Sequence, residues 1–370
     1  MTGNVYLHPI TLVSGPQAVE GDAVRLGGSM VYAREFALVL RDETGAATRI
    51  VTTAAGMPEA IARLPDTAAR EAERQWANIR KTHVPLQLGT RTIRLDQPQV
   101  MGILNVTPDS FSDGGQHEDL QAGRDHAAAM LEAGASIIDI GGESTRPGAA
   151  ATFEDEEIRR VVPAVEYCAA MGGAISVDTR RAGVLAAALA AGAHMANDVS
   201  ALRYDPRSIE VVAEAACPVV LMHAPGAGED LHAGAKYADV VSEVFDFLKL
   251  ARDRAIAAGV AEARIICDPG VGFGKSLGEN LALINALPLF HSLGSPILLG
   301  ASRKRMIGAL STEEAAGQRL AGSIALAVKG MEAGIHLLRA HDVAETVQAR
   351  NVWRGLKDAS LTDFSQLPPL

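Results

Sequence analysis

The fold of this chain is decided by residues 100–144, which read VMGILNVTPDSFSDGGQHEDLQAGRDHAAAMLEAGASIIDIGGES. A short apolar run ends at Asn105, a polar loop follows, and an Ala-rich stretch with helical spacing then ends at Gly134. Glycine at that position suits a helix C-terminus, and the second apolar run that comes after it ends near Ser144. A strand, a helix and a second strand in this order predict a βαβ unit with parallel strands.

The same pattern recurs to the end of the chain. Helical stretches such as RRAGVLAAALAAG (180–192) separate apolar runs that end in a polar residue or a glycine. The eight runs are VMGILN (100–105), SIIDIGGES (136–144), AISVD (174–178), HMAND (194–198), PVVLMH (218–223), RIICD (264–268), PILLGAS (296–302) and IHLLRAH (335–341). Strands that are apolar on both faces are typical of a parallel sheet covered by helices. The chain is therefore predicted to be an α/β protein with a (β/α)8 TIM barrel at residues 91–360. A doubly wound sheet is the alternative, although it usually has fewer strands and a Gly-rich first turn.

The first 90 residues do not follow this pattern. VYAREFALVLRDETGAATRIVTT (31–53) predicts two strands around a Thr-Gly turn, and PEAIARLPDTAAREAERQWANIRKT (58–82) predicts one or two helices. We expect a small N-terminal α+β appendage, residues 1–90, which carries no catalytic motif and serves in packing or subunit contact. TRTIRL (90–95) is expected to close the floor of the barrel.

Charge and composition limit the partners of the protein. The net charge of −10 argues against non-specific binding to nucleic acid. No apolar run is long enough to span a bilayer, and the first ten residues do not form a secretory signal. Cys168, Cys217 and Cys267 have no metal-like spacing and are expected to be buried, reduced thiols. We expect a cytoplasmic homodimer that acts on small molecules.

Polar residues at the strand ends should meet at one mouth of the barrel, where active sites of this fold lie. Asp178, Asn197 and Asp268 supply acceptors suited to a donor-rich heterocycle edge, such as a 2-amino-4-oxopyrimidine ring. The alternative for each aspartate is a cap on the next helix.

A cationic set is expected at the same mouth, comprising Arg146, Lys304, Arg339 and His341. Arginine forks and a lysine charge suit a phosphate or a diphosphate, and barrel phosphate sites often follow strands seven and eight. The alternative for Lys304 and its neighbours Arg303 and Arg305 is a solvated helix start, but cations there oppose the helix dipole.

Two loops are expected to act as lids over the mouth, NVTPDSFSDGG (105–115) and GGESTRPGAA (141–150). They carry Phe111, Thr145, Arg146 and Pro147. Asn105 offers the kind of oxygen that Mg²⁺ accepts together with phosphate oxygens. The stretch DPGVGFGKS (268–276) resembles a nucleotide-binding phosphate loop, but Pro269 stands where the first glycine should be. Its glycines are expected to permit close approach to a flat ligand, with Phe273 as an apolar wall.

These motifs together resemble the dihydropteroate synthase family, from about residue 98 to residue 350. The similar stretches are MGILNVTPDSFSDGG (101–115), GASIIDIGGESTRPGA (134–149), ISVDTR (175–180), AHMANDVS (193–200), LMH (221–223), DPGVGFGK (268–275), GASRKRMIG (300–308) and LRAHDV (338–343). The resemblance implies condensation of (7,8-dihydropterin-6-yl)methyl diphosphate with 4-aminobenzoate, which yields 7,8-dihydropteroate and diphosphate in folate biosynthesis.

The resemblance also implies roles for individual residues. The pterin would lie against Asp178, Asn197, Met222, Asp268 and Lys304, with Asp139 in support. The diphosphate would be held by Asn105, Thr145, Arg146, Arg339 and His341, with Mg²⁺ at Asn105. The aminobenzoate, or a competing sulfonamide, would lie against Phe111, Pro147, Phe273 and Ser302. Asp178, Lys304 and Arg339 are the expected catalytic residues.

The chain departs from the family pattern at Val271, where many members carry an aromatic residue, and at Arg305, where a small polar residue is common.

Three alternative functions are a corrinoid-linked methyltetrahydrofolate methyltransferase, a Schiff-base aldolase that uses Lys304, and a non-catalytic pterin-binding paralogue. The methyltransferase has no need of a diphosphate site, and the paralogue predicts degraded loops, whereas both loop motifs are complete here.

Overall fold

The computed structural model describes residues 4–16, 21–42, 45–107, 116–144, 152–226, 228, 230–233 and 236–363. Within them, eight parallel strands form one sheet in the order β12-β11-β10-β9-β8-β7-β14-β13. The strands are β7 (Gln99–Asn105), β8 (Ile137–Gly141), β9 (Ile175–Asp178), β10 (Met195–Asp198), β11 (Val219–Met222), β12 (Ile265–Asp268), β13 (Leu298–Leu299) and β14 (Leu337–Ala340).

The sheet closes on itself. A parallel bridge joins Cys267 on β12 to Ile297, the residue before β13, and the Cys267 N–H donates to the Pro296 carbonyl over 2.9 Å. The predicted (β/α)8 barrel is confirmed, and the doubly wound alternative is excluded because an open sheet keeps two unpaired edges.

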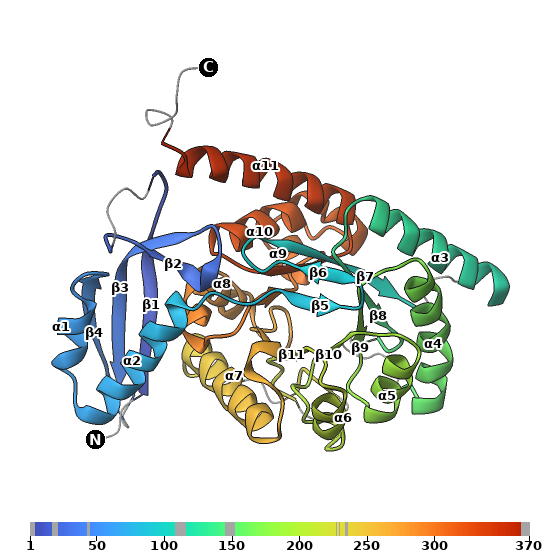
Figure 1. Cartoon of the computed structure of the whole chain (residues 1–370), viewed down its shortest axis with the longest axis horizontal. Helices are drawn as coiled ribbons and strands as arrows, with labels where there is room; N and C mark the ends of the chain where they lie inside the picture. Colours follow the sequence, from blue (N-terminus) through green and yellow to red (C-terminus); the bar gives the residue numbers. More distant parts are fainter. Residues whose placement is uncertain are drawn as a thin grey trace.

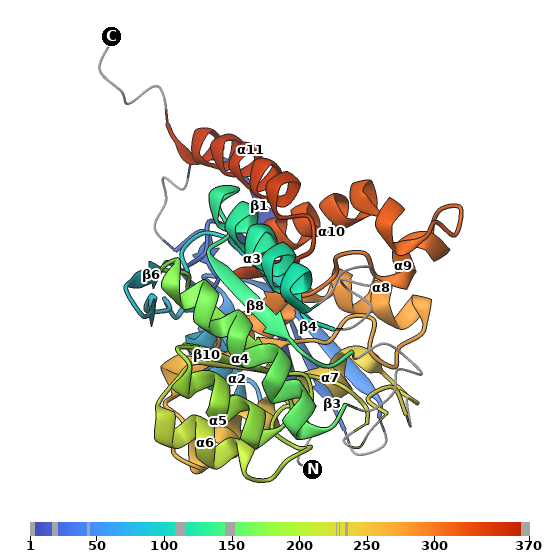
Figure 2. The same ribbon diagram turned by 90° about the vertical axis from the view of Figure 1, so that its right-hand side faces the viewer.

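Helices surround the barrel and cover its outer face (Figures 1 and 2). They are α3 (Gln116–Glu132), α4 (Glu154–Ala170), α5 (Ala182–Ala190), α6 (Ser208–Ala215), α7 (Val240–Ala257), α8 (Leu277–Asn285), α9 (Arg305–Ala309), α10 (Leu320–Glu332) and α11 (Val343–Leu361). Short 3₁₀ turns are η1 (Leu26–Gly28), η3 (Glu262–Arg264), η4 (Leu287–Leu293) and η5 (Ala316–Gln318). All four residues of β11 are buried, as expected for a strand with side chains in both the barrel interior and the helix layer.

The floor of the barrel is closed by a hairpin, as the sequence predicted for residues 90–95. Strands β5 (Leu86–Leu88) and β6 (Arg91–Ile93) pair antiparallel. Their buried apolar side chains form one cluster with the lowest inward residues of the barrel strands, among them Met101, Met195 and Leu337. The interior is therefore apolar at the amino ends of the strands, which leaves the carboxyl ends for polar groups.

The appendage contains the two predicted strands, β3 (Tyr32–Arg41) and β4 (Ala47–Thr53), and two helices, α1 (Met57–Ala62) and α2 (Asp66–Arg80). Part of the turn between the strands lies outside the described residues. Sequence analysis missed the ten-residue strand β1 (Asn4–Val13), which pairs antiparallel with β3, and the short β2 (Val24–Arg25). Pro9 lies inside β1 and obscures the strand pattern; it is accommodated next to a register shift.

The appendage packs along one side of the barrel, next to α7 (Figure 1). Tyr6 of β1 meets Phe245 of α7 edge-on at 5.6 Å, and Phe245 also contacts Phe290 of η4 at 6.4 Å. Phe36 and Trp76, which contact each other inside the appendage, belong to the same continuous buried cluster as these barrel residues. The appendage and the barrel thus share one hydrophobic core.

Two further expectations concern the whole chain. The three cysteines are free and buried, as predicted. Within the described ranges, no helix combines the length and the apolarity needed to cross a membrane.

Candidate active site

Arg339, on β14, lies at the polar mouth of the barrel and joins strands that are far apart in the sequence. Its Nε donates to Asp139 Oδ2 on β8 over 2.6 Å, and its Nη2 donates to Asp178 Oδ2 at the end of β9 over 2.7 Å. Asn197 on β10 donates from Nδ2 to the same Asp139 oxygen over 2.9 Å. Four strands therefore contribute to one hydrogen-bonded group, in which the fully buried Asp139 holds both Arg339 and Asn197.

The surroundings of Asp178 shift the pKa of its carboxyl group. Burial raises the pKa of the Asp178 carboxyl above its ordinary value, and the negative charge of Asp139 acts in the same direction, whereas the Arg339 guanidinium opposes the rise. The Arg339 guanidinium therefore limits how far the pKa of Asp178 rises.

Asn105 ends β7 next to Asp178. Both residues border Gly141, at the end of β8: a Cβ built there would make van der Waals contact with Asp178 Cβ at 3.5 Å and with Asn105 Oδ1 at 3.6 Å. The sequence expectation that these strand ends face one mouth agrees with this placement.

Asp268, at the end of β12, completes the acidic side of the mouth. A Cβ built on Gly300 would lie 3.8 Å from Asp268 Oδ2 and 3.9 Å from Arg339 Cβ, so Asp268 and Arg339 border the same space. Burial raises the pKa of Asp268 to about 6, although the Gly270 N–H that donates to its Oδ1 over 2.7 Å and the charge of Lys304 both lower it.

Lys304 precedes α9 and lies over the ring of Phe273, with Nζ 4.1 Å from the ring centroid. Burial lowers the pKa of Lys304 to about 8, and the positive charge of Arg339 adds to the effect. Gly272 makes this approach possible: its φ is +87°, and a Cβ would be 2.9 Å from Lys304 Cδ. From the sequence, we expected these glycines to allow the close approach of a flat ligand. In this structure, the group that lies close to Gly272 is the Lys304 side chain.

Ser302 and His341 lie together at the ends of strands seven and eight. The His341 N–H donates to Ser302 Oγ over 3.2 Å, and His341 Nδ1 is 3.1 Å from the same oxygen. Burial, with the charges of Arg339 and Arg303, lowers the pKa of His341 to about 4, so its imidazole is neutral at pH 7. Arg303 pairs with Asp342, whereas Arg305 is exposed.

Met222 is the last residue of β11 and packs among other apolar side chains. It is buried in one cluster with Val199, Ala224, Leu231 and Phe273. Val271, where the chain departs from the family pattern, is also buried.

Four expected site residues lie outside the described residues: Phe111, Thr145, Arg146 and Pro147. The lid function expected of the two loops falls largely on the same undescribed segments. In the part of the chain that the structure describes, no three His, Cys, Asp or Glu side chains are grouped to hold a metal ion.

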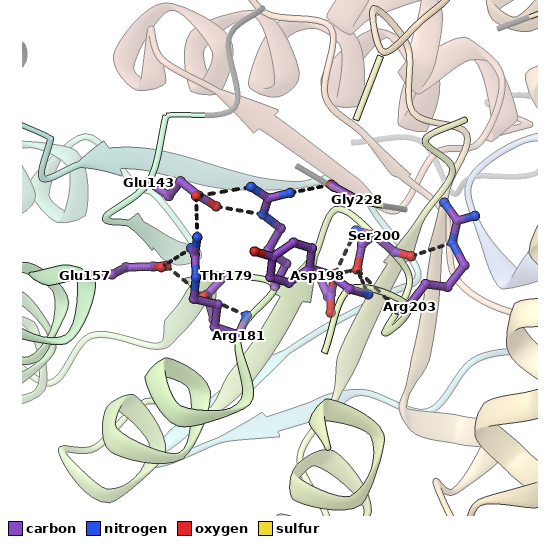
Figure 3. Close-up of polar contacts among 10 residues, drawn as sticks. Glu143, Glu157, Thr179, Arg181, Asp198, Ser200, Arg203 and Gly228 are labelled. Carbon is purple, nitrogen blue, oxygen red and sulfur yellow. Dashed lines mark hydrogen bonds and ion pairs between the residues drawn. The ribbon is translucent and has the colours of Figure 1, made fainter. Parts of the chain in front are cut away.

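Sequence analysis missed a buried ion-pair network beside Asp178 (Figure 3). Glu143 accepts from Arg180 Nε over 2.8 Å and pairs with Arg181 over 2.9 Å, while Arg181 also pairs with Glu157 over 2.7 Å. Thr179 donates to Glu157 over 2.7 Å. All four charged side chains are at most 8% exposed, so two positive and two negative charges balance in a low-dielectric environment. Two adjacent arginines directly after a buried strand were the available signal.

Lys275 was also missed. Its Nζ lies inside its own loop, 2.7 Å from the Gly270 carbonyl, 3.1 Å from the Phe273 carbonyl and 2.9 Å from His223 Nδ1. Burial lowers the pKa of Lys275 to about 7. The described contacts of Lys275 Nζ are therefore with its own loop and with His223.

Comparison with known proteins gives a consistent picture. A family model described as "Pterin binding enzyme" matches residues 101–341. Dihydropteroate synthase of Escherichia coli K12 is 46% identical over 262 residues, which are 70% of this chain and 92% of that protein. That of Haemophilus influenzae is 42% identical over 275 residues, 74% of this chain and 99% of that protein.

Solved structures agree. A dihydropteroate synthase of Xanthomonas albilineans with 4-aminobenzoic acid is 46% identical, with a TM-score of 0.70 over 78% of this chain and 100% of that chain. The same enzyme in complex with 7,8-dihydropteroate has a TM-score of 0.68 and 44% identity, covering 77% of this chain and 100% of that chain. These relatives favour the synthase over the methyltransferase alternative. Matched along most of its barrel by the family model and by close relatives, the chain belongs to the dihydropteroate synthase family of pterin-binding enzymes.

Proposed function

We propose that this chain is a transferase that condenses (7,8-dihydropterin-6-yl)methyl diphosphate with 4-aminobenzoate, releasing diphosphate and forming 7,8-dihydropteroate. The observation that carries the proposal is the partly exposed polar group at the mouth, where Arg339 joins Asp139 and Asp178 beside Asp268 and Lys304. The proposed assignment of catalysis to Asp178, Lys304 and Arg339 follows from their position in this group.

The acidic residues suit the pterin ring. The 2-amino group and the ring N–H groups of a pterin are donors, and the partly exposed Asp178 and the buried Asp268 carboxylates are acceptors. Asn197 uses its amide nitrogen on Asp139, so its amide oxygen is the group that accepts from the ligand. Met222 supplies an apolar surface for the flat ring, and Lys304 donates to the ring oxygen.

The cationic residues suit the diphosphate. Arg339 uses Nε and Nη2 on two carboxylates, and Nη1 forms no hydrogen bond with any described residue, so Nη1 is the group proposed to donate to a phosphate oxygen. The neutral His341 donates a ring N–H, and Thr145 and Arg146 are proposed to add further contacts.

Mg²⁺ fits this set as an ion that arrives with the diphosphate. Such an ion keeps several waters and takes few protein ligands, and the Asn105 amide oxygen beside Asp178 is one suitable ligand. When bound, it would neutralise charge on the phosphate oxygens.

The chemistry then divides into two steps. In the first, the bond between the exocyclic methylene carbon and the diphosphate oxygen breaks, and the electron pair leaves with the diphosphate while N5 of the ring supplies electron density. The charges of Asp178 and Asp268 stabilise the cationic pterin, and Arg339 stabilises the leaving group; one such preorganised interaction contributes roughly 3–4 kcal/mol. In the second, the aniline nitrogen forms the new C–N bond and loses its proton to a diphosphate oxygen or water, a step that needs orientation more than activation.

The amine is proposed to lie against Phe273 and Ser302, with Phe111 and Pro147 covering it.

We also propose a cytoplasmic homodimer in which residues 91–360 are the catalytic barrel and residues 1–90 the appendage. The free, buried cysteines are compatible with a reducing compartment. Sedimentation of the purified chain tests the oligomeric state.

One assay tests the function directly. The purified chain is incubated with the dihydropterin diphosphate, with and without 4-aminobenzoate, and both diphosphate and 7,8-dihydropteroate are quantified. We expect equal amounts of the two products when both substrates are present. Absence of dihydropteroate under these conditions contradicts the proposal.

A further inference from the structure

The segment after β11 carries no residue assigned above to a substrate. Its described residues are 223–226, 228, 230–233 and 236–239. This segment packs directly on the loop after β12. The His232 ring lies parallel to the Phe273 ring, with an angle of 10° between the planes and 5.4 Å between the centroids. The Gly274 N–H donates to His232 Nδ1 over 3.0 Å. Contacts with Phe273 and with the adjacent Gly274 therefore hold the His232 ring in one orientation.

Apolar contacts tie the same segment to the mouth. Leu231 and Ala224 are buried in one cluster with Met222 and Phe273. His232 thus directly follows Leu231, which shares one buried cluster with Met222 of the proposed pterin surface and Phe273 of the proposed amine surface.

Two arginines hold the early part of the segment, and Figure 3 shows the contact at Gly228. Arg203 Nη2 donates to the Ala224 carbonyl over 2.6 Å and to the Gly226 carbonyl over 3.0 Å. Arg180 Nη1 donates to the Gly228 carbonyl over 2.7 Å. Hydrogen bonds from charged donors are roughly twice as strong as neutral ones, so these bonds fix the backbone of the segment on the neighbouring loops.

The end of the segment is held from the appendage. Asp239 caps α7 by accepting from the N–H groups of Val241 and Ser242, and it also pairs with Arg41 at the end of β3. The segment is thus anchored on both sides of His232, and this anchoring restrains the position of its ring.

The hydrogen bond from Gly274 also selects the form of the ring. Because Nδ1 accepts, the proton of the neutral imidazole is on Nε2. The Phe273 ring that His232 contacts is the proposed amine surface, and its centroid lies 4.1 Å from Lys304 Nζ.

We propose that His232 determines specificity for the aromatic amine by positioning Phe273. This inference rests on the proposed function, in which the 4-aminobenzoate ring lies against Phe273. His232 acts through Phe273 and is a positioning residue. A Phe273 ring that is already oriented loses less side-chain entropy when the amine binds. His232 therefore lowers the KM for the amine without changing the bond-breaking step.

The test is a steady-state comparison of single and double variants of the full chain. We expect His232→Ala to raise the KM for 4-aminobenzoate by about 3- to 10-fold, the effect of losing one aromatic pair. The KM for the dihydropterin diphosphate and kcat should stay within about twofold of the parent values, because the pterin and diphosphate contacts are unchanged. His232→Phe keeps a stacked ring and should restore most of the affinity, whereas His232→Gln, which keeps only an acceptor, should not.

A double-mutant cycle separates positioning from general damage. In the Phe273→Ala background, His232→Ala should change the KM for the amine by less than about 1.5-fold, since the residue through which it acts is gone. His126→Ala, on the exposed surface of α3, is the matched control. Additive effects in the cycle, an unchanged KM for the amine in His232→Ala, or an equal rise in both KM values overturns the inference. Absence of turnover in the parent protein instead overturns the proposed function.

Discussion

Replacement of Arg339 by Met tests the central group of the site. Asp139 is fully buried and the Asp178 side chain is 14% exposed, and both lose their positive partner in this variant. Removal of one partner from a buried ion pair typically costs about 3–5 kcal/mol, because the remaining charge is uncompensated. We therefore expect Arg339→Met to lower the free energy of unfolding by about 3–5 kcal/mol near pH 8, in addition to lowering turnover at least about 10²-fold.

The loss of stability should depend on pH. Burial already raises the pKa of Asp178 in the folded parent protein, and removal of Arg339 removes the charge that opposes this rise. The folded variant therefore binds more protons than the unfolded chain over the range between the unfolded and folded pKa values. Stability consequently falls as the pH rises through that range, more steeply in the variant than in the parent. The deficit relative to the parent protein is largest above the folded pKa and shrinks toward about pH 5.

Urea unfolding at about pH 8 and about pH 5.5, with diphosphate release measured in parallel, checks both effects. The matched variant is Asp139→Asn combined with Arg339→Met, which removes both charges of one pair. We expect this double variant to recover at least about half of the lost stability but none of the lost turnover. Equal unfolding free energies for Arg339→Met and the parent near pH 8, or a double variant less stable than the single one, would refute the electrostatic reasoning.

Three further predictions follow from other parts of the structure. Lys304→Met should lower turnover at least about 10²-fold, because it removes a preorganised cation beside Asp268; diphosphate release at the parent rate contradicts this. The KM for the dihydropterin diphosphate should rise as the pH falls below about 6, because the pKa of Asp268 is raised to about 6 and its protonated form is a poorer acceptor; the pH profile of Asp268→Asn should lack this step. Deletion of residues 1–85 should lower the melting temperature and the soluble yield, because it removes Tyr6 from Phe245 in the shared core; a truncated chain with the parent melting temperature would show that the barrel packs alone.

The strand ends show how much of the site is predictable from the sequence. Asn105, Asp178 and Asp268 were recognisable because each ends an apolar run that precedes a helical stretch, and parallel strands in a barrel bring all such ends to one mouth. The sequence also predicted that TRTIRL (90–95) closes the floor of the barrel, and the structure adds that this segment belongs to a hairpin with Leu86–Leu88.

Other features could not be predicted from local patterns. Strand β1 was missed because Pro9 interrupts its pattern, and the antiparallel pairing with β3 that stabilises it is a tertiary contact. The roles of Glu143 and Arg180 were missed because each is an ordinary surface residue type, and only the meeting of two loops makes them a buried pair.

By itself, the sequence determined the barrel, the order of its strands and the side of the fold on which the polar residues lie, because these depend on the local periodicity of apolar residues. Only the tertiary structure decided which polar groups pair. From the sequence, Arg339 is expected to be available to bind an anion. In the structure, two of its nitrogens donate to Asp139 and Asp178, which lie 200 and 161 positions away. The physical reason is that closure of the barrel brings the last strand beside the first, and the choice of partner among buried charges depends on distances that local periodicity does not contain.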